Sequence, residues 1–379
     1  MKIGINLVQY TDVQGIEVFA SNILRELVKV ERHEYVFFVN ERSRGIFDVE
    51  GVKLVTVPVG NLSKLSRILA QQTRLPRLLK KEGVDLLFCP SVAVPLWYRK
   101  KVVTVHDCAW KRFSEEAGIV SRVYLRLAMA SIRYRSLGVV TVSDFAKKEL
   151  EVLFGIRSAT VISEGPPKLP RDEDERILSR LSLVSEKGVK PYFFFVGNFH
   201  YRKNLARALE AFRVFLHEYP DFSFVCAGKN TGSGFDAVKR TVDRLGIGER
   251  VIFSGFVSDE EKVSLYRNSV ALVFPSLYEG FGLPILEAQT LGVPVLAAAS
   301  SSLLEIAGDA AEFVDPFDIR SIKEGMERIA REGEGRKELI ARGRENVKRF
   351  SWEKTAEKIL SRFAGFMNNE TKYENLTGK

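Results

Sequence analysis

Short apolar runs alternate with amphipathic helical patterns along almost the whole chain. In the first half the expected strands are residues 2–8, 35–40, 52–58, 84–88, 101–106 and 138–142. The expected helices are residues 15–30, 62–82, 119–136 and 144–154. Strands and helices that alternate in this way predict βαβ units, in which helices cover both faces of a parallel sheet.

The alternation stops near Ser163-Glu164-Gly165-Pro166-Pro167 and the charged run after it, which together read as a linker. It then resumes. The second set of expected strands is residues 191–197, 222–227, 250–254, 270–274, 293–297 and 311–314. The second set of expected helices is residues 203–218, 234–246, 258–268, 284–291 and 318–331, and a last helical pattern starts near Trp352.

This α/β pattern predicts two doubly wound, Rossmann-like domains with a cleft between them, and such clefts are favoured ligand sites. We expect an N-terminal domain of residues 1–170 and a C-terminal domain of residues 185–350. We expect residues 351–368 to form a C-terminal helix that packs back on the N-terminal domain.

Composition narrows the class of protein. The chain has 379 residues, of which 45% are hydrophobic, enough for two to three domains of about 150 residues each. The three cysteines, Cys89, Cys108 and Cys226, are far apart and odd in number, which argues against a disulfide framework or a zinc site. The chain shows no signal-peptide pattern and no apolar stretch of ~18 residues, so we expect a cytoplasmic protein.

Charge is unevenly spread along the chain. The net charge is +9, and residues 60–150 contain 17 Lys and Arg against 7 Asp and Glu. Such a region attracts a membrane surface, a polyanion or a phosphorylated substrate, or it simply keeps the surface soluble. Residues 122–135 mix basic and apolar side chains, which suits peripheral attachment to the inner face of a membrane. The alternative is a core-packed helix with a basic outer face. We expect no nucleic-acid partner.

The most informative segment is residues 274–288, where an apolar strand leads into a glycine-rich turn. Pro284 opens a helix at a position where proline is well tolerated. Backbone N–H groups and a positive helix end at the carboxyl edge of a strand bind anions and nucleotides. Glu279 falls on the loop and Glu287 in the first helical turn, with seven residues between them. The segment therefore predicts a phosphate cradle between two acceptors for sugar hydroxyls.

A second turn, from Gly197 to Lys203, also leaves an apolar strand. Arg202 can bind phosphate oxygens bidentately, while Lys203 acts as a point charge. The alternative is a basic loop with solvated side chains. Because this turn and the turn at residues 274–288 both follow strands of one predicted domain, we expect them at the same edge of one sheet.

Three residues of the first half are weaker candidates. His106 ends a strand, where it could bind a sugar hydroxyl or a developing charge, or bond to the neighbouring Asp107. Ser143 could contact a phosphate or cap the next helix. Gly15 lets a substrate approach the backbone, or belongs to a plain strand–helix turn.

Residues 172–174 spell Asp-Glu-Asp, which superficially looks like a metal site. The motif lies in the charged linker without a preceding apolar strand, so we interpret it as a solvated face and expect no metal site.

These residues resemble the retaining glycosyltransferases of family 4, the group 1 glycosyl transferases, in their bacterial mannosyltransferase-like branch and with the two-Rossmann GT-B architecture. The resemblance covers nearly the whole chain and is strongest from Val196 to Asp315. The motifs that carry it are Gly197…Arg202-Lys203-Asn204, Gly255-Phe256-Val257-Ser258, Tyr266, Glu279-Gly280-Phe281-Gly282-Leu283-Pro284-Ile285-Leu286-Glu287-Ala288, Gly292-Val293-Pro294-Val295, Thr104-Val105-His106-Asp107 and Val142-Ser143.

The resemblance implies a nucleotide-diphosphate-sugar donor held mainly by the second domain. Arg202 and Lys203 would bind the diphosphate, Glu287 the ribose, and Glu279 the transferred sugar. The other implied donor contacts are Ser143, Gly197, Gly228 and the backbone of Phe281, Gly282 and Leu283. The implied neighbours of the reacting carbon and of the acceptor are His106 and Gly15, respectively.

The resemblance also implies retention of anomeric configuration without a bound metal, by same-face attack through an oxocarbenium-like transition state. The chain departs from the family pattern at Gln14, where many members have glycine, and at Ser163-Glu164-Gly165, where Asn-Gly is usual.

The expected function is transfer of a hexose from a GDP- or UDP-sugar to a glycan or lipid-linked acceptor in cell-surface polysaccharide or lipopolysaccharide biosynthesis. Mannose is the preferred sugar, and no cofactor is expected. Two alternatives stay open: a nucleotide-sugar epimerase, and a noncatalytic nucleotide-sugar-binding protein.

Overall fold

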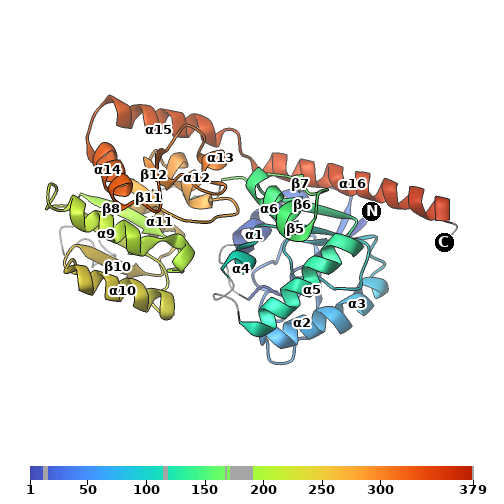
Figure 1. The fold of residues 1–379 in the computed structure, drawn as a ribbon. Coiled ribbons are helices and arrows are strands. Elements are labelled where there is room, and N and C mark those ends of the chain that lie inside the picture. Colours follow the sequence, from blue (N-terminus) through green and yellow to red (C-terminus); the bar gives the residue numbers. More distant parts are fainter. Residues whose placement is uncertain (12–15, 114–117, 167–168, 171–190, 378–379) are drawn as a thin grey trace. The chain divides into compact units, whose positions relative to one another are not determined.

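The computed structural model describes residues 1–11, 16–113, 118–166, 169–170 and 191–377. It divides into two compact units (Figure 1). Unit 1 comprises Met1–Gly165 and Phe350–Lys379, and unit 2 comprises Pro166–Arg349. Gly15 and residues 172–174 lie outside the described residues, so the expectations for them remain predictions.

Unit 1 is built on a sheet of seven parallel strands in the order β3-β2-β1-β4-β5-β6-β7. The strands are β1 (Lys2–Asn6), β2 (Glu34–Val39), β3 (Lys53–Thr56), β4 (Leu86–Cys89), β5 (Lys101–Val105), β6 (Gly138–Thr141) and β7 (Thr160–Val161). The helices are α1 (Ile16–Leu27), α2 (Lys64–Thr73), α3 (Leu75–Lys81), α4 (Ala109–Arg112), α5 (Ile119–Arg135), α6 (Asp144–Phe154) and α16 (Trp352–Thr377).

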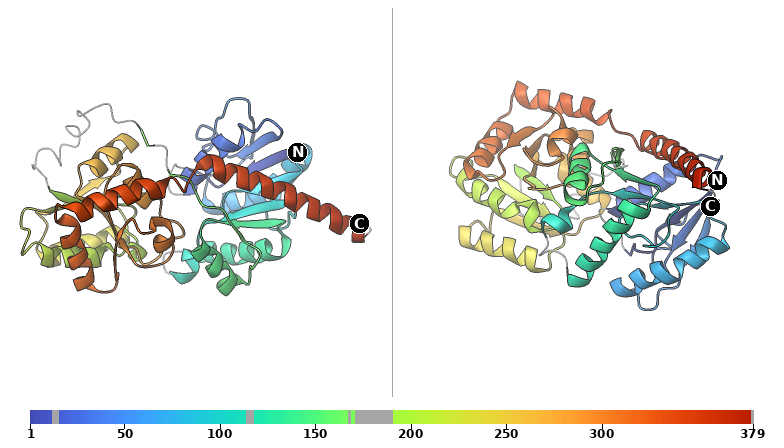
Figure 2. Two further views of the ribbon diagram at one scale, coloured as in Figure 1. Left: turned by 90° about the horizontal axis from the view of Figure 1, so that it is seen from above. Right: turned by 45° about the vertical axis from the view of Figure 1, so that its right-hand side comes forward.

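Alternating side chains of this sheet enter two separate cores, because successive residues of a strand point to opposite faces. Ile3, Ile5 and Phe88 belong to a buried cluster with α1 and α16. Phe38 and Val103 belong to a second cluster with α3, α5 and α6. The long C-terminal helix α16, red in Figure 2, contacts α1 and therefore completes one face of unit 1.

Unit 2 repeats this architecture with six parallel strands in the order β10-β9-β8-β11-β12-β13. The strands are β8 (Tyr192–Val196), β9 (Ser223–Ala227), β10 (Val251–Gly255), β11 (Ala271–Phe274), β12 (Val295–Ala298) and β13 (Glu312–Val314). The helices are η2 (Tyr201–Lys203, a 3₁₀ turn), α9 (Leu205–Phe215), α10 (Ser233–Leu245), α11 (Asp259–Arg267), α12 (Leu283–Thr290), α13 (Leu303–Ala307), α14 (Ile319–Ala330) and α15 (Glu334–Val347).

The central strand β8 is apolar on both sides because both faces of its sheet are covered. Phe193 and Phe195 pack with α9, α10 and α14, whereas Tyr192 and Phe194 pack with α11, α12 and α13. The expected fold class, two doubly wound parallel sheets, is therefore confirmed in both units.

Strand order also locates the ligand edge of unit 2. The chain builds from β8 outward through β9 and β10, then returns to pair β11 on the other side of β8. Ligands of doubly wound sheets bind outside the carboxyl ends of the strands at such a switch point. The turn at Gly197–Lys203 follows β8 and the turn at Pro275–Gly282 follows β11, so both flank the switch point.

The short helices α4 and α13 were not expected, and two longer segments also differ from expectation. Residues 62–82 form two helices, α2 and α3, because Pro76 falls in the first turn of α3 and its ring and missing N–H prevent one continuous helix. Helix α15 was not expected, since its sequence is mostly polar. It packs on α12, where Asn346 Nδ2 donates to Gln289 Oε1 at 2.7 Å.

Candidate active site

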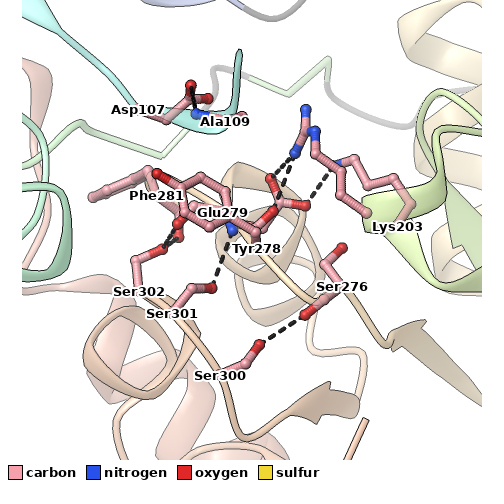
Figure 3. Close-up of polar contacts among 11 residues, drawn as sticks. Asp107, Ala109, Lys203, Ser276, Tyr278, Glu279, Phe281, Ser300, Ser301 and Ser302 are labelled. Atoms are coloured by element: carbon pink, nitrogen blue, oxygen red, sulfur yellow. Dashed lines mark hydrogen bonds and ion pairs between the residues drawn. The ribbon is translucent and has the colours of Figure 1, made fainter. Parts of the chain in front are cut away.

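The turns that follow β8 and β11 are bonded to each other. The backbone N–H of Leu277 donates to the Arg202 carbonyl oxygen at 2.8 Å. Lys203 Nζ lies 2.5 Å from Glu279 Oε1, and Arg202 Nη1 lies 3.2 Å from Glu279 Oε2 and 3.1 Å from the Tyr278 carbonyl oxygen. Figure 3 shows the Glu279 carboxylate pointing toward Lys203. The expectation that both turns share one edge of one sheet is thus confirmed.

The local backbone geometry directs both Arg202 and Lys203 toward the turn that follows β11. Residues 201–203 form a single 3₁₀ turn that ends at Asn204, which has a left-handed φ of 56°. The Asn204 side-chain amide donates to the carbonyl oxygens of Pro275 at 3.2 Å and Pro316 at 2.7 Å. Asn204 therefore fastens the β8 turn to the loops that follow β11 and β13.

The three charged side chains are largely buried, with 12% of Lys203, 19% of Arg202 and 11% of Glu279 exposed. The Lys203 ammonium also lies 5.0 Å from the ring centre of Phe274, a cation–π contact. Burial raises the pKa of the Glu279 carboxyl, but the charges of Lys203 and Arg202 outweigh burial and hold this pKa below its ordinary value. Glu279 is therefore ionised, and the cluster keeps one positive charge in excess for an anion.

Two serines after β12 form hydrogen bonds with the backbone of the turn that follows β11. The Glu279 N–H donates to Ser301 Oγ at 3.0 Å. Ser302 Oγ lies 2.9 Å from the Glu279 carbonyl oxygen and 2.7 Å from that of Phe281 (Figure 3). These serines were not among the expected site residues. The only sequence signal for them is a run of serines, residues 300–302, shortly after an expected strand.

Helix α12 begins at this turn. Gly282 precedes it with a φ of 119°, which a side-chain-bearing residue rarely adopts, and a Cβ there would lie 3.0 Å from Leu303 Cδ2. Leu283 is the first helical residue and Pro284 the second. The positive end of α12 therefore lies beside Glu279 and the buried Phe281.

Glu287 lies one residue further along α12 than expected, because the helix starts at Leu283 and Glu287 is its fifth residue. Its carboxylate accepts from Lys262 Nζ at 2.9 Å and from the Tyr266 hydroxyl at 2.8 Å. Burial lowers the pKa of Lys262, but the charges of Glu287 and Asp259 outweigh burial, so this pKa is raised and Lys262 stays charged. Lys262 of α11 was missed by the sequence analysis.

Glycines bring the ends of β8, β9 and β10 close together. A Cβ on Gly228 would collide with the carbonyl oxygen of Gly197, and the Gly228 N–H donates to the Gly255 carbonyl oxygen at 3.0 Å. The Gly197 N–H donates to the Ala227 carbonyl oxygen at 2.9 Å. Glycine backbone without side chains therefore lines the edge of the unit 2 sheet at the ends of these three strands, next to the turn that follows β8.

In unit 1, His106 is held by other contacts than expected, and Ser143 by one of the two contacts expected for it. His106 Nδ1 lies 3.1 Å from Glu164 Oε1, and Nε2 lies 2.9 Å from the Pro90 carbonyl oxygen. The alternative that His106 bonds to Asp107 is wrong, because Asp107 Oδ1 accepts from the Ala109 N–H at the start of α4. Ser143 caps α6 by accepting from the Ala146 N–H at 3.1 Å, which was the alternative reading for this residue.

The structure thus assembles most of the expected donor-binding residues at one edge of unit 2. His106 and Ser143 belong to unit 1, at the ends of β5 and β6. Among the described residues, no three His, Cys, Asp or Glu side chains are grouped as metal ligands.

The sequence matches two glycosyltransferase family models and several curated relatives. Residues 183–346 match the model "Glycosyl transferases group 1", and residues 13–167 match the model "Glycosyltransferase Family 4". The O-antigen chain mannosyltransferase B of Escherichia coli is 30% identical over 284 residues, which cover 72% of this chain and 72% of that protein. The chain belongs to the family 4 glycosyltransferases.

Further relatives of this glycosyltransferase agree with that assignment. The O-antigen chain mannosyltransferase RfbU of Salmonella typhimurium is 27% identical over 292 residues, 75% of this chain and 78% of that protein. A sucrose-phosphate synthase structure from Thermosynechococcus elongatus superposes with a TM-score of 0.78 at 19% identity. That superposition covers 97% of this chain and 99% of the other, and it supports the GT-B fold alone.

The geometry of Glu279 generates a first prediction. Glu279→Gln removes the charge that partly neutralises Arg202 and Lys203, so inorganic pyrophosphate should bind about tenfold more tightly, a gain of about 1.4 kcal/mol. Calorimetric titration in EDTA at low salt measures this change. Glu218→Gln is the matched control, since Glu218 pairs with Lys323 at the exposed surface of the same unit. Unchanged or weaker binding to Glu279→Gln would contradict the counter-ion role.

Proposed function

We propose that this glycosyltransferase is a retaining, metal-independent hexosyltransferase with a nucleoside-diphosphate sugar as donor. Its acceptor is a glycan or a lipid-linked glycan of a cell-surface polysaccharide. The observation that carries the proposal is the adjacent pair Arg202 and Lys203, bonded to Glu279 at the switch point of the unit 2 sheet. No cofactor is needed for this chemistry.

Departure of the leaving group builds negative charge on the diphosphate. Arg202, Lys203 and the amide end of α12 are positioned for this charge before the reaction begins, so they need no reorganisation in the transition state. One such preorganised donor typically contributes about 3–4 kcal/mol. Fixed cations of this kind can neutralise a diphosphate without a divalent ion.

Same-face attack fits the electrostatics of Glu279 better than a covalent intermediate does. A carboxylate bonded to two cations, with a lowered pKa, is a weak nucleophile and a weak base. In the proposed step the bond from the anomeric carbon to the diphosphate oxygen breaks, and the acceptor oxygen bonds to the same face of that carbon. The acceptor proton passes to the departing diphosphate, and Glu279 orients the sugar hydroxyls.

Mannose is the proposed sugar, because the Escherichia coli and Salmonella typhimurium relatives are both named mannosyltransferases of O-antigen chains. GDP-mannose is accordingly the first donor to test and UDP-sugars are the second. The same names favour an O-antigen-like, lipopolysaccharide-type acceptor.

Turnover with a panel of donors tests the proposed function. We expect nucleotide release from one donor in the presence of lipid-linked glycan, unaffected by EDTA, with the anomeric configuration retained in the NMR spectrum of the product. Lys203→Ala should lower kcat by roughly 10²–10³-fold, because a preorganised cation is lost, while Glu218→Gln should not. Conversion of the donor without any acceptor would instead indicate an epimerase. Binding without turnover of any donor would indicate a noncatalytic binding protein.

We further propose that unit 1 attaches peripherally to the cytoplasmic, anionic leaflet of a membrane through α5. This helix buries Met129 and Ile132 in the core, and it also leaves Val120, Val123 and Leu127 more than half exposed. The alternative of a core-packed helix with only a basic outer face is therefore incomplete. Within the described part of the chain, no helix is long and apolar enough to span a bilayer.

Charge and aromatic side chains on and beside α5 complement such a leaflet. The helix contains four arginines, Arg122, Arg126, Arg133 and Arg135, and no acidic residue. Trp97 is 73% exposed, and the Arg135 guanidinium carbon lies 4.4 Å from the centre of its ring. Each basic side chain near an anionic surface contributes about 1 kcal/mol, and exposed apolar side chains add insertion into the interface.

Liposome sedimentation tests this attachment. Binding to vesicles with anionic lipid should fall severalfold in Val123→Asp/Leu127→Asp and at high salt, because insertion and attraction are both weakened. Val152→Asp is the matched control, since Val152 is an exposed apolar residue on α6 of the same unit. Equal binding by all three proteins, or equal binding to neutral vesicles, would contradict the proposal.

A further inference from the structure

Glu164 lies in the segment where the chain leaves unit 1, and the returning helix α16 anchors this segment. The Thr355 hydroxyl lies 2.7 Å from the Ser163 carbonyl oxygen and 2.8 Å from that of Ser351, and it can donate to either. Gly165 lies so close to Trp352 that a Cβ on it would be 2.5 Å from the Trp352 backbone nitrogen. These two contacts flank Glu164 and set the position of its buried carboxylate.

The His106 ring is bonded at both of its nitrogen atoms. A carbonyl oxygen only accepts, so the contact between Nε2 and the Pro90 carbonyl oxygen requires a proton on Nε2. The contact between Nδ1 and Glu164 then requires a second proton between those two groups. The ring of Phe19 packs against that of His106 with centres 4.6 Å apart, and Trp352 packs against Phe19 in turn. The imidazole is therefore enclosed as well as bonded.

We propose that Glu164 is a positioning residue for His106, and that the two side chains share one proton that keeps the ring bonded to both Pro90 and the exit segment. Without this proton a lone pair of the ring faces an oxygen lone pair, either at Pro90 or at Glu164. The ring must then release one of the two partners. Protonation thus decides whether His106 is held in a single orientation at the end of β5.

The charges around the ring give the direction of this dependence on pH. Among the described residues, the charged groups that act on it are Glu164 from the exit segment and Asp107 from the following loop. Burial lowers the pKa of His106. The hydrogen bond and charge of Glu164 raise it, the Pro90 carbonyl and the Asp107 charge raise it further, and together they outweigh burial. The shared proton and its contribution to stability are therefore present at low pH. Both are lost as pH rises through the raised value.

Replacing the Glu164 carboxylate with an amide removes the shared proton but can keep both hydrogen bonds of the His106 ring. In Glu164→Gln the amide can donate to an unprotonated Nδ1 while Nε2–H still donates to Pro90, so both contacts survive without the extra proton. In Glu164→Ala the ring loses its partner altogether. Glu149→Gln is the matched control, because Glu149 is another buried carboxylate of unit 1 and is paired with Arg112 instead.

NMR titration of the free protein tests the proposal without any substrate. The chain has only four histidines, so the His106 signal can be assigned with His106→Gln. We expect the pKa of His106 to fall in Glu164→Gln and to stay unchanged in Glu149→Gln. Thr355→Val, which frees the exit segment but keeps the carboxylate, should lower it by a smaller amount. An unchanged His106 titration in Glu164→Gln and Thr355→Val would overturn the proposal, even if the enzyme is active.

Kinetic measurements extend the test. They rest on the proposed function and on the role beside the reacting carbon that the family resemblance implies for His106. Wild-type kcat should decline at alkaline pH as the shared proton is lost, whereas Glu164→Gln should lose this decline. Glu164→Ala should lower kcat about tenfold at low pH, and by less at alkaline pH where the wild type has itself lost the shared proton, while leaving the KM for donor unchanged, since the proposed diphosphate contacts lie in unit 2. An alkaline decline that persists in Glu164→Gln would contradict the shared proton. Absence of turnover with every donor would contradict the proposed function but not the NMR result.

Discussion

The ligand edge of unit 2 depends on the bonds of one carboxylate, that of Glu279, to two neighbouring cations, Arg202 and Lys203. It joins the turn after β8 to the turn after β11, at the point where the strand order of unit 2 reverses. Two like charges side by side and largely buried would repel each other without such a partner. The carboxylate therefore stabilises the two cations and leaves one positive charge in excess for an anionic ligand.

Much of this arrangement was predictable, because apolar strands and glycine-rich turns are local patterns. The turns at residues 197–203 and 274–288 were expected at one edge, and the contact between Leu277 and Arg202 confirms this. Individual side-chain contacts between different elements were not predictable. Lys262 reaches Glu287 from α11, and Ser302 supports the β11 turn from the end of β12. Neither partner has a sequence pattern that points to its target.

Errors in the expected elements have physical reasons too. The break between α2 and α3 follows from Pro76, whose effect on a helix is local and could have been anticipated. Helix α15 lacks an apolar stripe and is held by polar side chains such as Asn346, so periodicity could not reveal it. The partner of His106 was missed because Glu164 lies 58 residues away in the chain. The adjacent Asp107 was therefore the expected partner.

The central claim is that fixed cations of unit 2, without a divalent ion, hold the diphosphate of the donor. The most direct measurement compares the affinity of a nucleoside diphosphate with that of its nucleoside in EDTA, for wild type and for Arg202→Ala/Lys203→Ala. The account predicts that wild type binds the diphosphate far more tightly and that the double substitution removes this preference without weakening nucleoside binding. A preference that appears only with Mg²⁺, or that survives the double substitution, would contradict it.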